Sequence, residues 1–235
     1  LLLTGSAFAA PNIYVDAVSG NDANAGDDPT TPVATISQGI NLVDAGGTVH
    51  VETGDYEDSI TIGKSLSLLG PNADVDPNTQ TRGPEATLWA TEHNTPYTAY
   101  HSTMIVNAGD VTVNGFLFEG FNPSHASGSE PTGPDGTNPV GEHSAIFGYS
   151  GDNNSISYNV FQNFSQLGLY DFGQGQGHAF TFNRAVNIGV PNVLGFGSMV
   201  TYYNTFGAIE DNYCRYVRSF TQWQLQNYDG APAII

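Results

Sequence analysis

The sequence predicts an all-β fold, namely a right-handed, single-stranded parallel β-helix: a three-sided solenoid with a short N-terminal capping helix. Short apolar runs that end in Gly or Asn within a few residues are typical of strands joined by tight turns. Charged residues are only 12% of the chain, which contains 28 Gly and 13 Pro, so helices with charged outer faces are not expected. A short motif also repeats along the chain at intervals typical of a solenoid.

The first elements can be placed in order. Residues 13–15 predict a strand, and residues 19–32 form a polar loop rich in Gly, Asn and Asp. Thr35 is a suitable N-cap for a short helix that continues to Val43 and ends at Gly46 and Gly47. From residue 48 onward the pattern changes to short strands, at 49–51, 60–62 and 66–68, with no helices between them.

The repeat has the form apolar, any residue, apolar, Asn, any residue, apolar. Its four asparagines are Asn114, Asn159, Asn183 and Asn212, separated by 45, 24 and 29 residues. The period-2 pattern breaks at each Asn, so we expect each Asn to turn the chain in a left-handed conformation. The four should stack at one corner of coils of about 24 residues. The 45-residue interval contains an insertion, Asn122 to Glu142.

The N-terminal coils resemble a known family. The loop Gly20-Asn-Asp-Ala-Asn-Ala-Gly26 is followed by the strand Gly47-Thr-Val-His-Val51, the turn Gly54-Asp-Tyr56 and the strand Lys64-Ser-Leu-Ser-Leu-Leu-Gly70. This order is similar to that of the pectate-lyase-like superfamily of secreted right-handed β-helices, and the likeness extends from Ile13 to Val217. The resemblance implies the fold but no single activity, because the superfamily includes lyases, hydrolases, esterases and adhesins.

The two ends of the chain predict a cleaved signal peptide at the N-terminus and further coils beyond the C-terminus. Residues 1–9 are interpreted as the remnant of a signal peptide, with Ala7-Phe8-Ala9 as the small-x-small cleavage pattern. Residues 10–235 are expected to form one β-helix domain that is truncated at its C-terminus. The protein is therefore expected to be secreted or at the cell surface, with no membrane insertion.

The charge balance restricts the partners. Five Lys and Arg residues oppose 23 Asp and Glu, a formal net charge of −18. Such a surface repels nucleic acid and anionic membranes, so the expected partner of a monomeric protein is a polysaccharide. The single cysteine, Cys214, is expected to be a small buried hydrophobe in a strand.

The residues that could act on a polysaccharide cluster around one stretch. A lyase needs a base and a cation beside the sugar carboxylate, and His178, Asp171 and Arg184 are the candidate catalytic residues. Candidate substrate-binding residues are Tyr170, Arg215, Tyr97, Tyr100 and His143. The insertions at 71–102 and 122–142 could line one side of a groove that holds these side chains.

Two functions remain open from the residues alone. The first is a non-catalytic, adhesin-like protein that binds glycans; the alternative is a polysaccharide lyase of the pectate or alginate type. Paired-aspartate hydrolase motifs do not occur, and only Gly177-His178-Ala179 resembles part of one. Whether the protein is an enzyme is left undecided by the sequence.

One loop has the composition of a calcium site. Asp22, Asn24 and Asp27 group oxygen ligands around Gly26, as calcium loops do, so calcium is the one expected cofactor. The alternative is a turn stabilised by its own Asx hydrogen bonds.

Overall fold

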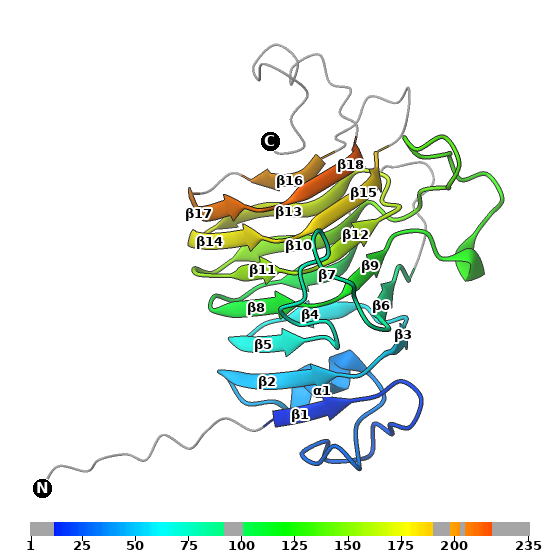
Figure 1. Ribbon diagram of the computed structural model, residues 1–235. Coiled ribbons are helices and arrows are strands. Elements are labelled where there is room, and N and C mark those ends of the chain that lie inside the picture. Colours follow the sequence, from blue (N-terminus) through cyan, green and yellow to red (C-terminus); the bar gives the residue numbers. More distant parts are fainter. Residues whose placement is uncertain (1–11, 92–100, 190–197, 203–204, 218–235) are drawn as a thin grey trace, which may run out of the picture.

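The computed structural model describes residues 12–91, 101–189, 198–202 and 205–217. Its strands form three sheets in which every pairing between strands is parallel. The chain passes from sheet A to sheet B to sheet C and then begins the next coil one level higher, so the sheets stack as three sides of a prism (Figure 1). The predicted three-sided parallel β-helix is confirmed.

From β2 onward the described chain adds one short strand to each of the three sides in turn. Sheet A contains, in order, β1 (Asn12–Val15), β2 (Gly47–Val51), β5 (Leu66–Leu69), β8 (Val111–Asn114), β11 (Ser155–Ser157), β14 (Gln176–Thr181) and β17 (Thr205–Glu210). Sheet B contains β3 (Gly54–Tyr56), β6 (Ala86–Trp89), β9 (Leu117–Glu119), β12 (Val160–Gln162), β15 (Arg184–Ile188) and β18 (Tyr213–Val217). Sheet C contains β4 (Ile60–Ile62), β7 (Ser102–Val106), β10 (Ser144–Ser150), β13 (Leu167–Gln174) and β16 (Ser198–Tyr202).

The N-terminal end is covered by the predicted helix. Helix α1 (Ile36–Leu42) begins after Thr35, whose side chain accepts a hydrogen bond from the Gln38 amide. Ile36 and Ile40 point into the core beneath the first coil, so the helix closes the open end of the apolar interior. This helix, the only α-helix among the described residues, is too short and polar to cross a membrane.

The core is a column of apolar side chains between the three sheets. Alternate residues of each strand point inward, as the burial pattern of β2 shows. Phe118, Phe161 and Phe180 stack through consecutive coils, with ring centroids 5.1 Å and 5.8 Å apart. All three are fully buried, so aromatic stacking continues along the axis of the prism.

Asn159, Asn183 and Asn212 form the predicted ladder at the corner between sheets A and B, whereas the Asn114 side chain bonds Asp74 in the loop after β5. Asn159 Oδ1 accepts from the Phe116 amide, and Asn159 Nδ2 donates to the Val113 carbonyl, both at 3.0 Å. Asn183 and Asn212 repeat the pattern one and two coils higher: Asn183 Oδ1 accepts from the Asn159 amide and Asn212 Oδ1 from the Asn183 amide. Each side chain thus joins its own coil to the coil below.

The prediction that each of these asparagines adopts the left-handed conformation is wrong. The left-handed residue in three of the four repeats is the one before the Asn, namely Tyr158, Phe182 and Asp211, with φ of 57°, 53° and 54°. In the first repeat it is Gly115, which follows Asn114, with φ of 87°. The turn therefore comes from the neighbour, and the Asn is left in an ordinary conformation with its amide directed inward to bond the backbone.

Two of the described loops leave the prism beside sheet B. The first, residues 70–85, we call the strap; it connects β5 to β6 and crosses the corner between sheets A and B (Figure 1). The second, residues 120–143, contains the predicted insertion (122–142) and is called the insertion below. It includes the 3-10 helix η1 (Pro123–His125) and leaves the corner between sheets B and C. Sheet B lies between these two corners.

Candidate functional site

The outer face of sheet B is bordered on both edges by a loop. At one edge the strap is held by Asn78, whose amide donates to the carbonyls of Asn183 and Asp211. At the other edge the insertion is held by Asn187, which accepts from the Asp135 amide and donates to the Asn138 carbonyl. The sequence suggested that the two insertions line one side of a groove; instead they flank opposite edges of one sheet.

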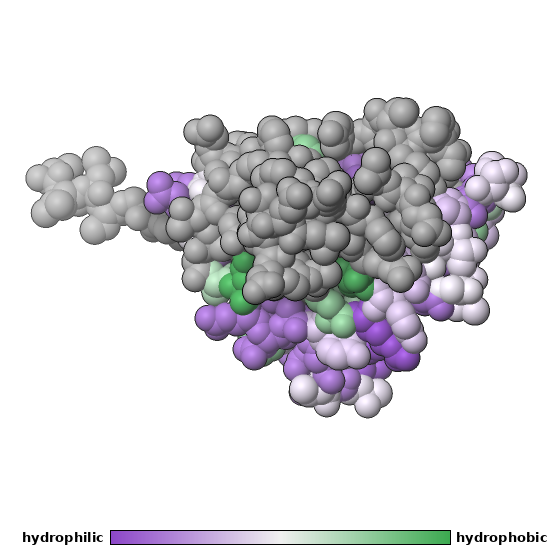
Figure 2. Space-filling view, turned by 90° about the horizontal axis from the view of Figure 1, so that it is seen from above, coloured by the Kyte–Doolittle hydropathy of each residue, from purple (hydrophilic) through white to green (hydrophobic). Residues whose placement is uncertain are grey.

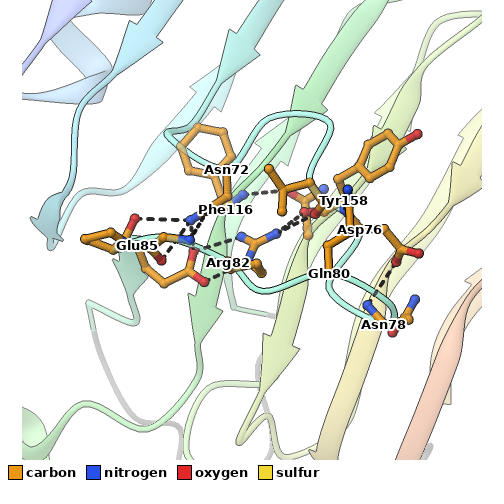
Figure 3. A network of polar contacts seen from close by, with 12 residues as sticks. Asn72, Asp76, Asn78, Gln80, Arg82, Glu85, Phe116 and Tyr158 are labelled. Atoms are coloured by element: carbon orange, nitrogen blue, oxygen red, sulfur yellow. Dashed lines mark hydrogen bonds and ion pairs between the residues drawn. The ribbon is translucent and has the colours of Figure 1, made fainter.

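The strap is fixed by a partly buried network of polar contacts (Figure 3). Arg82 forms two parallel bonds to the Glu85 carboxylate, at 2.7 Å and 2.8 Å, and its third nitrogen donates to the Tyr158 carbonyl at 2.7 Å. The Asn72 amide bonds Glu85 Oε2 and the Pro84 carbonyl. A planar, bidentate pair of this kind holds one geometry, so this border of the sheet B face is rigid.

One end of the face contains a pocket of about 370 Å³. Asp55 and Trp89 line it from the neighbouring strands β3 and β6, and the indole Nε1 donates to Asp55 Oδ1 at 2.8 Å. Glu57 also lines it, one residue beyond β3, and Asn122 and Pro123 close it from the insertion. We call the group Asp55, Glu57 and Trp89 the acidic end.

The carboxylate of Glu57 is fixed from the insertion. His125 Nε2 and Glu57 Oε1 form a hydrogen bond of 2.5 Å, in which the histidine adds an ion pair when protonated. This bond lowers the pKa of Glu57 below its ordinary value, against a smaller opposing effect of burial. Asn122 Nδ2 donates to the Ala90 carbonyl, which ties the start of the insertion to the coil beside the pocket. These two hydrogen bonds therefore hold the insertion against the prism at the pocket.

The middle of the face is less open. Glu119 is 5% exposed and accepts bonds from the Phe121 amide, Gln162 Nε2 and Asn163 Nδ2. Burial raises the pKa of this carboxyl, and the three donors act in the opposite direction. The half-buried aliphatic residues Val160 and Val186 complete this region.

The other end of the face is cationic and aromatic. Arg184 on β15 lies over the ring of Tyr213 on β18, with its guanidinium carbon 5.7 Å from the ring centroid. Arg215 lies over the ring of Tyr216 at 4.8 Å and donates to the Tyr216 hydroxyl at 3.0 Å. Tyr213 and Tyr216 are 46% and 45% exposed. We call these four residues the basic end.

Two of the predicted site residues are thus brought together. Arg184 and Arg215 lie on adjacent strands of sheet B, since Arg215 pairs in register with Val186, two residues after Arg184. From the strand spacing and the rise per residue, their Cα atoms are about 8 Å apart. Both side chains share the outer face with the two tyrosines.

The expected grouping of Arg184 with His178, Asp171 and Tyr170 is not formed. His178 lies on β14 in sheet A and is only 5% exposed, whereas Asp171 and Tyr170 lie on β13 in sheet C. Residues a few positions apart are distributed over three sides because one coil of the solenoid takes the chain through all three sheets. The predicted catalytic set therefore spans three different sides of the prism.

The other candidates have different outcomes. His143 is 3% exposed, so it cannot offer a ring to a bound sugar, and burial lowers its pKa to about 4. Tyr97 and Tyr100 lie outside the described residues. Cys214 lies in a strand, β18, as expected, but it is only half-buried against the core; burial raises its pKa to about 11.

The candidate calcium loop is tied by internal hydrogen bonds. Asp22 accepts from the amides of Ala34 and Thr35, and Asn24 Nδ2 donates to the Pro32 carbonyl. Asp27 is exposed. In the described part of the chain no group of three or more His, Cys, Asp and Glu side chains is placed to hold a metal ion. Calcium binding by Asp22, Asn24 and Asp27 stays a prediction.

The acidic end was missed from the sequence. The region from 71 to 102 was taken as one insertion, so β6 and the outward-facing Trp89 were not recognised as part of a coil. The signal was present in Ala-Thr-Leu-Trp, in which buried Leu88 is followed by a half-buried aromatic residue, as on a strand with one face outward. Asp55 follows the same rule beside buried Tyr56.

Comparison with known proteins now adds a family. A family model described as "Protein of unknown function (DUF1565)" matches residues 18–212, which include every strand from β2 to β16. The chain belongs to this family. A search of curated proteins finds no match to this DUF1565 member.

Solved structures provide fold neighbours of this family member. One is the GH136 lacto-N-biosidase from Eubacterium ramulus, with 10% identity and a TM-score of 0.38 over 87% of this chain and 56% of that chain. The chain thus spans little more than half of that enzyme. Another is the pectin methylesterase from Aspergillus niger, with 13% identity and a TM-score of 0.41 over 89% and 90% of the two chains.

Proposed function

We propose that the protein binds a polysaccharide on the outer face of sheet B and does not cleave it. The observation that carries the proposal is the pocket at the acidic end, which Trp89 lines together with the carboxylates of Asp55 and Glu57 and with the start of the insertion. An indole offers a flat apolar surface to a sugar ring, and carboxylate oxygens accept hydrogen bonds from its hydroxyls. A position at the surface or outside the cell accords with such a ligand.

The face is also long enough for a chain of sugars. Trp89, Glu119, Gln162, Val186 and Arg215 pair in register on consecutive strands of sheet B. Four strand spacings separate the first from the last, a distance of about 19 Å. A polymer lying parallel to the axis of the prism would contact both ends of this column, and the two loops would limit its sideways movement.

Binding without cleavage is favoured over lyase or hydrolase chemistry by the titratable groups. A glycosidase needs a carboxylic acid with a raised pKa beside a second carboxylate. In the pocket the pKa of Glu57 is lowered, and Asp55 is bonded to the indole of Trp89. Glu119, whose pKa is raised, is only 5% exposed and accepts from three donors, so its carboxyl is not presented to a glycosidic oxygen. A lyase needs a base beside its cation, and His178 and Asp171 lie on other sheets than Arg184.

Trp89→Ala tests the proposal. Binding of wild type and variant to a panel of neutral and acidic polysaccharides is measured by calorimetry, and the variant should bind about tenfold or more weakly because the stacking surface is lost. Tyr14→Ala is the matched control, since Tyr14 is a half-buried aromatic residue that stacks on His50 on sheet A. Equal affinities of Trp89→Ala and wild type would refute the site. Release of unsaturated or shortened products by the wild type would refute the non-catalytic function.

A further inference from the structure

The basic residues of this chain are distributed in an uneven way. Of the five Lys and Arg residues, Lys64 donates to the carbonyls of Asn41 and Val43 at the end of α1, and Arg82 is paired with Glu85 in the strap. Arg218 lies outside the described residues. The remaining two, Arg184 and Arg215, share the outer face of sheet B.

Neither of these two arginines is neutralised within the described residues. Their contacts are with tyrosine rings and, for Arg215, the Tyr216 hydroxyl; neither forms an ion pair with a carboxylate of the described chain. The Nε–H of Arg184 is also shielded from solvent and has no hydrogen-bond partner there. A ligand cannot reach this shielded Nε, so a bound anion would take its hydrogen bonds from the other guanidinium nitrogens of the two side chains.

The positive charge of Arg184 and Arg215 is unusual in such an acidic chain. The whole chain carries −18, and the described surface seen from the C-terminal end of the prism is mainly hydrophilic (Figure 2). The nearest acidic residues along the chain, Glu210 and Asp211, precede Tyr213 on the sheet A side of the corner. Two adjacent guanidinium groups on aromatic rings are suited to a planar or tetrahedral anion, because guanidinium nitrogens can donate two parallel bonds.

We propose that the basic end is a subsite for an anionic substituent, a carboxylate or a sulfate ester, of the same polysaccharide whose uncharged part occupies the acidic end. This inference rests on the proposed function. Tyr213 and Tyr216 support the sugar ring, while Arg184 and Arg215 bind its anionic group. Asp55 and Glu57 repel such a group at the opposite end, so the face fixes the direction in which a charged sugar lies.

The test compares polymers that differ only in charge. Affinities are measured at low and high salt for polygalacturonate and its carboxyl-reduced form, and for a carrageenan and its desulfated form, which separates carboxylate from sulfate. Arg184→Gln and Arg215→Gln should each weaken binding of the anionic member of a pair about tenfold or more and reduce its dependence on salt. Binding of the uncharged member should not change. Lys64→Gln, which removes one positive charge far from the face, is the matched control.

The two proposals can fail separately. If the arginine variants bind anionic and neutral polymers as the wild type does, or if neither anionic polymer binds more tightly than its uncharged form, the anion subsite is refuted. The proposed function then still stands on loss of neutral binding in Trp89→Ala. If Trp89→Ala changes nothing while the arginine variants lose anionic binding, the subsite stands and the pocket fails.

Discussion

Replacing Asn159 by Leu should destabilise the fold by removing a fully buried polar link between coils. The side chain is 0% exposed and satisfies two backbone groups, the Phe116 amide and the Val113 carbonyl. Leaving each of these unpaired costs about 1–3 kcal/mol, and burial of the larger apolar side chain offsets about 1.5–3 kcal/mol of the sum. We expect a net loss of about 1–3 kcal/mol in the free energy of unfolding.

Urea unfolding followed by circular dichroism measures this loss as a lower midpoint at unchanged slope. In a chain of this length each kcal/mol lowers Tm by about 2–4 °C, which gives a second reading of the same quantity. Asn41→Leu on α1 is the control, because Asn41 is exposed and its change should stay within about 0.5 kcal/mol. If Asn159→Leu unfolds at the same urea concentration as the wild type, the ladder does not stabilise the coils as argued.

Two further predictions concern buried charge. The pKa of His143 is lowered to about 4 by burial, below the ordinary value of 6.5, so the unfolded chain binds its proton first. Stability from this site is therefore complete above about pH 6.5 and falls by up to about 3 kcal/mol as pH decreases to 4, whereas His143→Gln should show a flatter profile of unfolding free energy over the same window. Arg82→Met leaves the partly buried Glu85 carboxylate and the Tyr158 carbonyl without their partner, so we expect a loss of about 1.5–3 kcal/mol and faster proteolysis within residues 71–85. The double variant Arg82→Met, Glu85→Met should recover part of the loss; a double variant as unstable as the single one would contradict an effect of unpaired charge.

The corner asparagines were predictable because their signal is local. A six-residue pattern includes both the strand and the turn, and the break in alternation at Asn114, Asn159 and Asn183 locates the corner without knowledge of any neighbour. The residue that adopts φ near +55° was not identified, since Tyr158 and Phe182 are not residues that favour that region. Their rings stack at 4.9 Å in adjacent coils, a contact that only the assembled structure provides.

The candidate site was less predictable, since it depends on which side of the prism each residue occupies. Arg184 and Arg215 were found because both have outward parity on the strands that follow corner asparagines in successive repeats. His178 was placed with them on the basis of distance along the chain, but the corner between β14 and β15 separates the two. The pocket at Trp89 needed three segments, from coils at two levels and from the insertion, and no single stretch of sequence carries that combination.

The strap affects the order in which the coils unfold. In an ordinary solenoid each repeat contacts only its immediate neighbours, so the array can fray from a free end one repeat at a time. Here a loop that starts in the coil of β5 bonds to Asn114, Tyr158, Asn183 and Asp211, in four successive coils above it. Fraying of the uppermost of these coils must break contacts with a segment anchored far below. Nearest-neighbour additivity should therefore fail over these coils, which behave as one cooperative unit, and the face that they share keeps its shape until the whole unit opens.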